Sequence, residues 1–413
     1  MHILTARSHI DVKNQLLFLL LGLSLLRLIL SVSKESFIFI DFLSYLDATH
    51  ALFHKLNPFD MSNLIIKNGL TGNPWTEPPL FFPAQFSFFL PFLLFSPQHA
   101  NILFFILNTL LLLFGSYFFV YAFTQNKTLS LLSTFILFNS APALTALRHG
   151  QLSIIVPALF LGALYVQNRW LQAFFLALAG ALKFSLLPFL GLLFLMKKKY
   201  FLVFSSSLFF VSLLLSPLLF GHNIITLLSD YQEAIHKTTT SLSGHNNYGG
   251  ISTYNFIHFE FFKPQWINMI GKVSMLGLAI YTLFKERKER KTSLTALLLL
   301  YMLTLSIAYH RVYDATFALL LLLPIAISSQ NILPRLLLLW FIIPESITYR
   351  FYRILASFSQ NQQLIWVSSD TQKNSYINPL FPGDACLVTI LLGLSIYLYF
   401  SKKKKASYEP LYI

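Results

Sequence analysis

Charged side chains are scarce in this sequence of 413 residues. Aspartate, glutamate, lysine and arginine make up 11% of the chain, whereas hydrophobic residues make up 55%. A soluble globular domain carries about 25% charged residues, so this composition excludes an ordinary soluble enzyme. Cysteine is almost absent as well: Cys386 is the only one, which excludes an intrachain disulfide.

Long apolar runs are what the sequence has instead. Many approach 20 residues with almost no charge, the length that crosses about 30 Å of hydrocarbon as a helix. They are too long and too continuously apolar for the strands of a membrane barrel. We therefore predict an all-α, polytopic transmembrane helical bundle of about 11–12 spans, with amphipathic interfacial helices in the first outer loop. The expected spans lie near 15–33, 79–96, 100–123, 129–146, 151–166, 170–196, 200–221, 266–284, 293–309, 314–330, 334–349 and 384–400.

The net charge of +14 is concentrated in short runs between these spans. The densest runs are Lys197–Lys199, Lys285–Lys291 and Lys402–Lys405. Cytoplasmic loops are enriched in lysine and arginine, so this pattern favours membrane topology over nucleic-acid binding. If the first span is uncleaved and the N-terminus is cytoplasmic, all three runs fall inside and the long loops 34–78, 222–265 and 350–383 fall outside. We expect a multi-pass protein of a bacterial inner membrane with both termini in the cytoplasm.

The same pattern divides the chain into three parts. We expect a first transmembrane module over 1–221 that includes the outer loop 34–78, a second outer loop over 222–265, and a C-terminal transmembrane module over 266–413. Within 125–196 the apolar pieces are short or interrupted, by Lys183 and Pro188 for example. Broken or re-entrant helices are expected there, and such backbone is tolerated at membrane depth where it lines a cavity.

The first outer loop contains the stretch DFLSYLDATHALFHKLNPFD, residues 41–60, in which three aspartates lie among apolar residues. Asp41 has two interpretations. It is either the N-cap of the helix that follows or a general base at the outer membrane face. On a helical wheel Asp41 and Tyr45 share one face, which we expect to be the packed one.

The opposite face of the same helix carries Asp47, His50 and His54. Two histidines four residues apart with a carboxylate could hold a metal ion, but no companion motif is present. We favour the alternative that they form the solvated face of an interfacial helix. Asp60 follows Asn57-Pro58 and is expected to be a turn residue.

Polar residues within or beside apolar runs are the remaining candidates, because an ionisable group at membrane depth usually faces a cavity. Arg148, His149 and Gln151 belong to ALRHGQLSII, which is either a plain short loop or a functional turn around Gly150. Lys183 lies in LALAGALKFSLLP, several residues from either end of its run. It either extends to the membrane surface or meets a phosphate or carboxylate.

Two more candidate groups lie later in the chain. His310, Arg311 and Tyr313 come just before Asp314, which is a local salt-bridge partner for Arg311 in one interpretation; a lipid phosphate is the partner in the other. The second outer loop contains SLSGHNNYGG, with Asn246 and Tyr248. Such loops either bind sugars or are simply flexible.

The order of these motifs resembles the GT-C glycosyltransferases, and glycosyltransferase family 87 in particular. The resemblance covers roughly residues 37–325. It rests on short motifs in a shared order: Asp41, Tyr45, Ala48, Ala51 and Asn57–Asp60, then Glu77-Pro78-Pro79, then His149–Gln151, then Gly180, Lys183 and Pro188, and finally His310 and Tyr313. The family's Tyr-Pro-Pro motif has glutamate, Glu77, in place of the tyrosine here.

The resemblance implies a GT-C-like fold and an inverting transfer on the outer face. The sugar, a hexose with mannose favoured or a pentose, would move from a polyprenyl-phosphate-linked donor to a lipid or glycan acceptor. Asp41 would be the catalytic base. Four basic residues would bind the donor phosphate: Lys183, Arg148, His310 and Arg311. Six residues would contact substrate: Tyr45, His149, Gln151, Tyr313, Asn246 and Tyr248. Neither a metal nor a cofactor is expected, and membrane lipids are the only other partner.

Other function classes stay open at this point. Intramembrane Asp41, Arg148 and Lys183 could line the path of a transporter or of a lipid-linked glycan flippase. Transporters often contain internal repeats, and none of fixed period occurs in this chain. A purely structural membrane protein would leave Lys183 and Arg311 without a purpose.

Overall fold

The computed structural model describes residues 12–34, 39–75, 78–79, 81–183, 198–243 and 315–328, with single positions at 277, 297–298, 301, 335 and 338. Every regular element in these ranges is helical, which confirms the all-α prediction. The longer helices are α1 Val12–Lys34, α2 Ile40–Phe53, α5 Pro97–Leu110, α6 Ser116–Thr124, α7 Lys127–Phe138, α8 Ala141–His149, α9 Ile155–Tyr165, α10 Arg169–Leu182, α12 Tyr200–Leu215, α13 Ile224–Ser243 and α16 Ala315–Ser328. Short helices lie between them: α3 Ile66–Thr71, α4 Phe86–Phe89, and the 3-10 turns Met61–Asn63, Pro83–Gln85, Leu90–Leu94 and Ser216–Phe220.

Three helical stretches of the described part are long and apolar enough to cross a membrane. They are Val12–Leu30, Pro97–Thr124 and Tyr200–Phe220. Each coincides with an expected span, near 15–33, 100–123 and 200–221. The second is one continuous rod because a π-helical turn, Leu111–Gly115, joins α5 to α6. Of the expected spans near 266–284, 293–309 and 334–349, the structure describes only the single positions 277, 297–298, 301, 335 and 338, and the one near 384–400 lies outside the described residues.

The apolar piece expected near 129–146 is a broken helix, as its composition predicted. Its two halves, Lys127–Phe138 and Pro142–His149, are bent by 59° relative to each other. Ser140 causes the break, because it caps the second half by accepting the backbone N–H of Ala143 at 3.4 Å, and Pro142 follows in the first turn. Proline in a first turn lacks the N–H that would continue the previous helix. Helices α9 and α10 are also shorter than a full span, with 11 and 14 residues.

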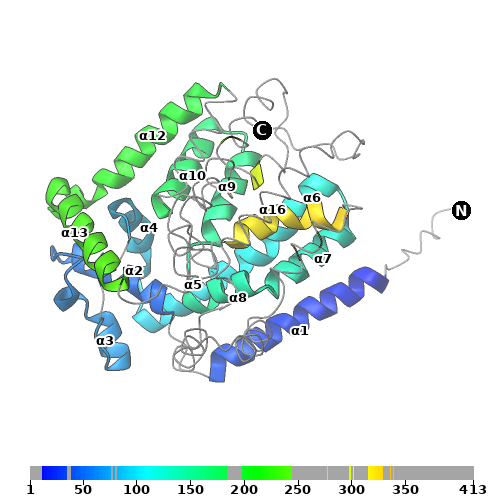
Figure 1. Ribbon diagram of the computed structural model, residues 1–413, viewed down its shortest axis with the longest axis horizontal. Helices are drawn as coiled ribbons and strands as arrows, with labels where there is room; N and C mark the ends of the chain where they lie inside the picture. Colours follow the sequence, from blue (N-terminus) through cyan, green and yellow to red (C-terminus); the bar gives the residue numbers. More distant parts are fainter. Residues whose placement is uncertain are drawn as a thin grey trace, which may run out of the picture.

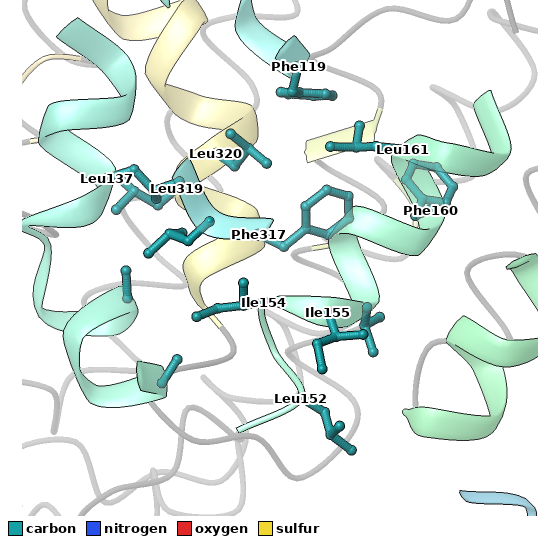
Figure 2. Close-up of a cluster of buried hydrophobic side chains, with 14 of the residues drawn as sticks. Phe119, Leu137, Leu152, Ile154, Ile155, Phe160, Leu161, Phe317, Leu319 and Leu320 are labelled. Atoms are coloured by element: carbon teal, nitrogen blue, oxygen red, sulfur yellow. The ribbon is translucent and has the colours of Figure 1, made fainter. Parts of the chain in front are cut away.

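A single large apolar core joins the early helices to α16 (Figure 1). Figure 2 shows Phe317, Leu319 and Leu320 of α16 among Leu137, Ile154 and Phe160. The ring of Phe317 lies edge-on to Phe160, with centroids 5.7 Å apart. Segments about 160 residues apart in sequence therefore share one core. Burial of a leucine, isoleucine or phenylalanine side chain stabilises a fold by about 1.5–3 kcal/mol in water.

Helix α2 lies between this core and a second buried cluster, which includes Phe59, Leu64 and Phe81. Phe42 stacks on Phe104 of α5, with ring centroids 4.3 Å apart. Tyr45 stacks on Phe89 of α4 at 4.9 Å. On its other side α2 buries Ala48, Ala51 and Leu52 in the second cluster, together with Leu227 of α13. Helix α2 is therefore packed on more than one side.

This packing corrects the prediction of a solvated face carrying Asp47, His50 and His54. Asp47 is completely buried, and eight of the fourteen residues of α2 are buried in all. The side chain of Asp41, expected on the packed face, keeps 22% of its surface accessible. His54 is exposed as predicted, and His50 is half-buried. The helical-wheel prediction was wrong for Asp47 because residues 61–75 fold back over that side of α2.

Candidate active site

Asp41 lies in the first turn of α2. The helix begins at Ile40, and its cap residue, Phe39, makes no capping hydrogen bond through a side chain. Asp41 is therefore one position inside the helix, and the N-cap interpretation is wrong. A carboxylate in a first turn is favoured by the helix dipole, and its oxygens remain free to face the end of another helix.

That other helix is α8, which ends in a Schellman motif. The backbone N–H of Gln151 donates to the carbonyl of Ala146 at 2.9 Å, and that of Gly150 donates to Leu147 at 3.3 Å. Gly150 adopts φ +66°, a left-handed conformation that glycine tolerates. A Cβ atom added at Gly150 would lie 2.7 Å from the Cβ of Phe39 and 2.8 Å from that of Phe42. Glycine thus lets the end of α8 touch the start of α2.

The close approach places the His-Gly-Gln turn against Asp41, 110 residues away in sequence. The side-chain amide Nε2 of Gln151 donates a hydrogen bond to Oδ2 of Asp41. Nδ1 of His149 lies 3.6 Å from the same oxygen. The hydroxyl of Tyr45, one helical turn after Asp41, donates to Oε1 of Gln151 at 3.4 Å. One polar cluster therefore contains four residues that belong to separate sequence motifs: Asp41, Tyr45, His149 and Gln151.

Lys183 is the fifth residue of this cluster. It caps the C-terminal end of α10, where a cation is favourable. Its side-chain amino group donates to Oγ of Ser153, two residues after Gln151, at 3.1 Å. Ser153 is buried, so the lysine side chain is directed into the protein. The alternative that Lys183 extends to the membrane surface is therefore wrong.

The other predicted site residues do not join the cluster in the described structure. Arg148, the neighbour of His149, is exposed, and its side chain forms no hydrogen bond or ion pair with a described residue. The remaining five lie outside the described residues: Asn246, Tyr248, His310, Arg311 and Tyr313.

Asp47 anchors residues 66–75 to α2. Its Oδ1 accepts the backbone N–H of Ile66 at 2.6 Å, and its Oδ2 accepts the N–H of Lys67 at 3.0 Å and the indole N–H of Trp75 at 2.7 Å. The ammonium group of Lys67 lies 4.1 Å from the centre of the Trp75 ring, a cation–π contact. Sequence reasoning missed this role, because no local motif connects an aspartate to donors 19 to 28 residues later.

The two histidines after Asp47 are not its companions in a metal site. Both oxygens of Asp47 already accept hydrogen bonds, and the described residues contain no cluster of three His, Cys, Asp or Glu side chains that could hold a metal. The rings of His50 and His54 lie 4.3 Å apart. Burial is the main cause that lowers the pKa of His50. The nearby His54 lowers it further, whereas Asp47 raises it.

Asp60 is a turn residue, as predicted. It caps the short helix Met61–Asn63 by accepting the backbone N–H of Ser62 at 3.0 Å and its hydroxyl at 2.7 Å. These hydrogen bonds lower the pKa of Asp60. Asn57, at the start of the same turn, donates to Asp230 of α13 at 3.0 Å, so this turn is the point where α13 docks.

Comparison with known proteins now identifies the family. Neither the curated proteins nor the solved structures gave a match. The model of glycosyltransferase family 87 matches residues 75–329, more than half of the chain. His149, Gln151 and Lys183 lie inside the matched range, and Asp41 precedes it. The chain therefore belongs to glycosyltransferase family 87 and is a membrane glycosyltransferase.

Proposed function

We propose that this protein transfers a sugar from a polyprenyl-phosphate-linked donor to a lipid or glycan acceptor, with inversion, and that Asp41 is the general base. The sugar is a hexose, with mannose favoured, or a pentose. The site faces the outer side of a bacterial inner membrane, and both termini lie in the cytoplasm. Family membership supports glycosyl transfer over the transporter and flippase alternatives.

One observation carries the proposal: Asp41 is partly accessible and is held by residues at the end of α8. Its side chain keeps 22% of its surface accessible, whereas Asp47, six residues later, is sealed. Gln151, at the end of α8, donates a hydrogen bond to its carboxylate, and Lys183, at the end of α10, is bound to Ser153, two residues after Gln151. A carboxylate that is oriented and still reachable has the properties that a base requires.

The transfer step follows from this arrangement. The acceptor hydroxyl attacks the anomeric carbon of the donor sugar while Asp41 takes the hydroxyl proton. The new glycosidic C–O bond forms as the bond between the anomeric carbon and the phosphate oxygen breaks. The polyprenyl phosphate leaves with the electron pair, and because attack comes from the opposite face the configuration inverts.

The negative charge that develops on the leaving phosphate needs a cation. We propose that Lys183 supplies one, and its hydrogen bond to Ser153 holds the side-chain nitrogen in place. We propose that Arg148, His310 and Arg311 complete the phosphate site. We also propose that His149, Tyr313, Asn246 and Tyr248 contact the sugar or the acceptor.

The test is a transfer assay with the purified full chain in lipid nanodiscs, a polyprenyl-phosphate mannose donor and a membrane-lipid extract as acceptor. Asp41→Asn keeps the shape of the side chain and removes the base, so transfer should fall by about 10²- to 10⁴-fold. Asp230→Asn is the matched control, because Asp230 interacts with Asn57 away from the cluster, and it should keep wild-type activity.

Two results would overturn the proposal in different ways. Wild-type activity in Asp41→Asn, with Asp230→Asn also active, would remove Asp41 as the base. A wild-type protein that transfers glucose from a nucleotide-linked donor, and nothing from polyprenyl-phosphate sugars, would replace the donor class and keep the family.

A further inference from the structure

Gln151 was expected to contact substrate, but both ends of its amide are already engaged inside the protein. The Nε2 group donates to Asp41, and the Oε1 atom accepts from the hydroxyl of Tyr45 at 3.4 Å. Only 5% of the residue is exposed. A substrate hydroxyl would have to displace one of these two partners to reach the amide. Gln151 therefore lies behind the reacting carboxylate.

The chemistry of the three groups gives this chain of hydrogen bonds one direction. A carboxylate can only accept, so the NH₂ side of the amide must face Asp41. The carbonyl side then faces Tyr45, which can donate through its O–H. A glutamine without Tyr45 could rotate by 180° about its last bond and present its oxygen to the carboxylate. Tyr45 opposes that rotation.

Tyr45 is itself held in place by ring packing. It stacks on Phe89 with centroids 4.9 Å apart and an interplanar angle of 22°, and it meets Phe81 edge-on at 5.8 Å. Phe89 is fully buried, and so is nearly all of Phe81. These contacts fix the direction in which the phenol ring, and hence its hydroxyl, points. The packed aromatic rings thus restrain Tyr45, Tyr45 restrains Gln151, and Gln151 in turn restrains Asp41.

We infer that Gln151 and Tyr45 are positioning residues: Gln151 orients the carboxylate of Asp41, and Tyr45 orients Gln151. The inference deepens the proposed function and rests on it where turnover is concerned. It assigns both residues a role through Asp41 in place of the substrate contacts expected from the sequence. A positioning role predicts that their loss lowers kcat, whereas loss of a substrate contact raises KM.

The experiment compares Gln151→Met, Tyr45→Phe and the double variant in the nanodisc transfer assay. Gln151→Met removes one hydrogen bond to a charged group and should lower kcat by about 10- to 100-fold with KM within about 2-fold of wild type. Tyr45→Phe keeps the ring packing and should lower kcat by about 2- to 10-fold. Gln172→Met is the control, because Gln172 hydrogen-bonds Val166 at the far end of α10, and it should leave both constants unchanged.

The double variant separates positioning from independent effects. If Tyr45 acts through Gln151, Tyr45→Phe has nothing left to disturb in the Gln151→Met background. The double variant should then match Gln151→Met within about 2-fold. Independent losses that multiply, or a raised KM with unchanged kcat in either single variant, would overturn the inference.

A second measurement needs no turnover. Infrared difference spectra between the wild type and Asp41→Asn isolate the carboxylate band of Asp41. Gln151→Met should shift that band, and Tyr45→Phe should shift it less, because each weakens the hydrogen bond on Oδ2. An unmoved band overturns the inference even if the donor proposed above is wrong, and a shifted band supports it in the same circumstance.

Discussion

Gly150→Ala tests the contact that brings the His-Gly-Gln turn to Asp41. Two separate costs follow from the structure. The first is backbone strain, because an alanine at φ +66° adopts the left-handed conformation at about 1–2 kcal/mol. The second is steric, because the new methyl group would lie 2.7 Å from the Cβ of Phe39 and 2.8 Å from that of Phe42. Overpacking of this kind costs about 1–3 kcal/mol, so the free energy of unfolding should fall by about 2–5 kcal/mol.

Gly72 offers a control that isolates the first cost. It ends α3 with φ +70°, nearly the same backbone conformation, but nothing lies within 4 Å of an added Cβ. Gly72→Ala should therefore lose only about 1–2 kcal/mol. Both variants are compared with wild type by equilibrium unfolding in mixed detergent–SDS micelles, followed by tryptophan fluorescence.

The transfer assay adds a functional readout to the same pair. Gly150→Ala forces the end of α8 away from the start of α2, so Gln151 and His149 separate from Asp41 and kcat should fall. Gly72→Ala leaves this contact intact and should keep wild-type activity. Equal unfolding free energies for the two variants, or an active Gly150→Ala, would refute the reasoning that α8 and α2 touch through this glycine.

Asp47 and His50 of α2 each lead to a further prediction. Asp47→Asn replaces one accepting oxygen with an NH₂ group, which faces at least one backbone N–H whichever way the amide turns. It should lower the unfolding free energy by about 2–6 kcal/mol and speed tryptic cleavage after Lys67. Asp230→Asn should lose no more than about 1.5 kcal/mol. If the two losses are equal, Asp47 does not anchor the loop. The pKa of His50 is lowered by burial and by His54, so the unfolded chain binds more protons and the unfolding free energy should decline as pH falls through about 6.5. His50→Gln should flatten this decline between pH 7.5 and 5.5, whereas His99→Gln, at an exposed position on α5, should keep it; an unchanged slope in His50→Gln would contradict the assignment.

Local composition was enough to predict the helical membrane architecture. Apolar runs such as 100–123 have no stable alternative to a helix in lipid, because each backbone N–H and C=O needs a partner within the chain. The break in 129–146 was also predictable, because Ser140 and Pro142 end one helix and start the next through local interactions alone. The family was predicted from the order of several short motifs. A shared order is informative even when each motif alone is weak.

The arrangement of the candidate site depended on the tertiary structure. Asp41, His149 and Lys183 were each identified as unusual polar groups in apolar surroundings, but nothing in their spacing showed that they meet. Their meeting depends on how closely two helix ends approach, and Gly150 controls that distance through its missing side chain. The different roles of Gln151 and Tyr45 depend on the same contact.

The two aspartates of α2 show where the sequence reaches its limit. A helical wheel orders Asp41 and Asp47 around one axis, which is a local property that the sequence alone determines. Other segments of the chain decide which of them is buried and which stays accessible. Residues 66–75 close over Asp47, whereas the end of α8 meets Asp41 and leaves it reachable. Burial is a property of what packs against a residue, and only the folded chain determines those partners.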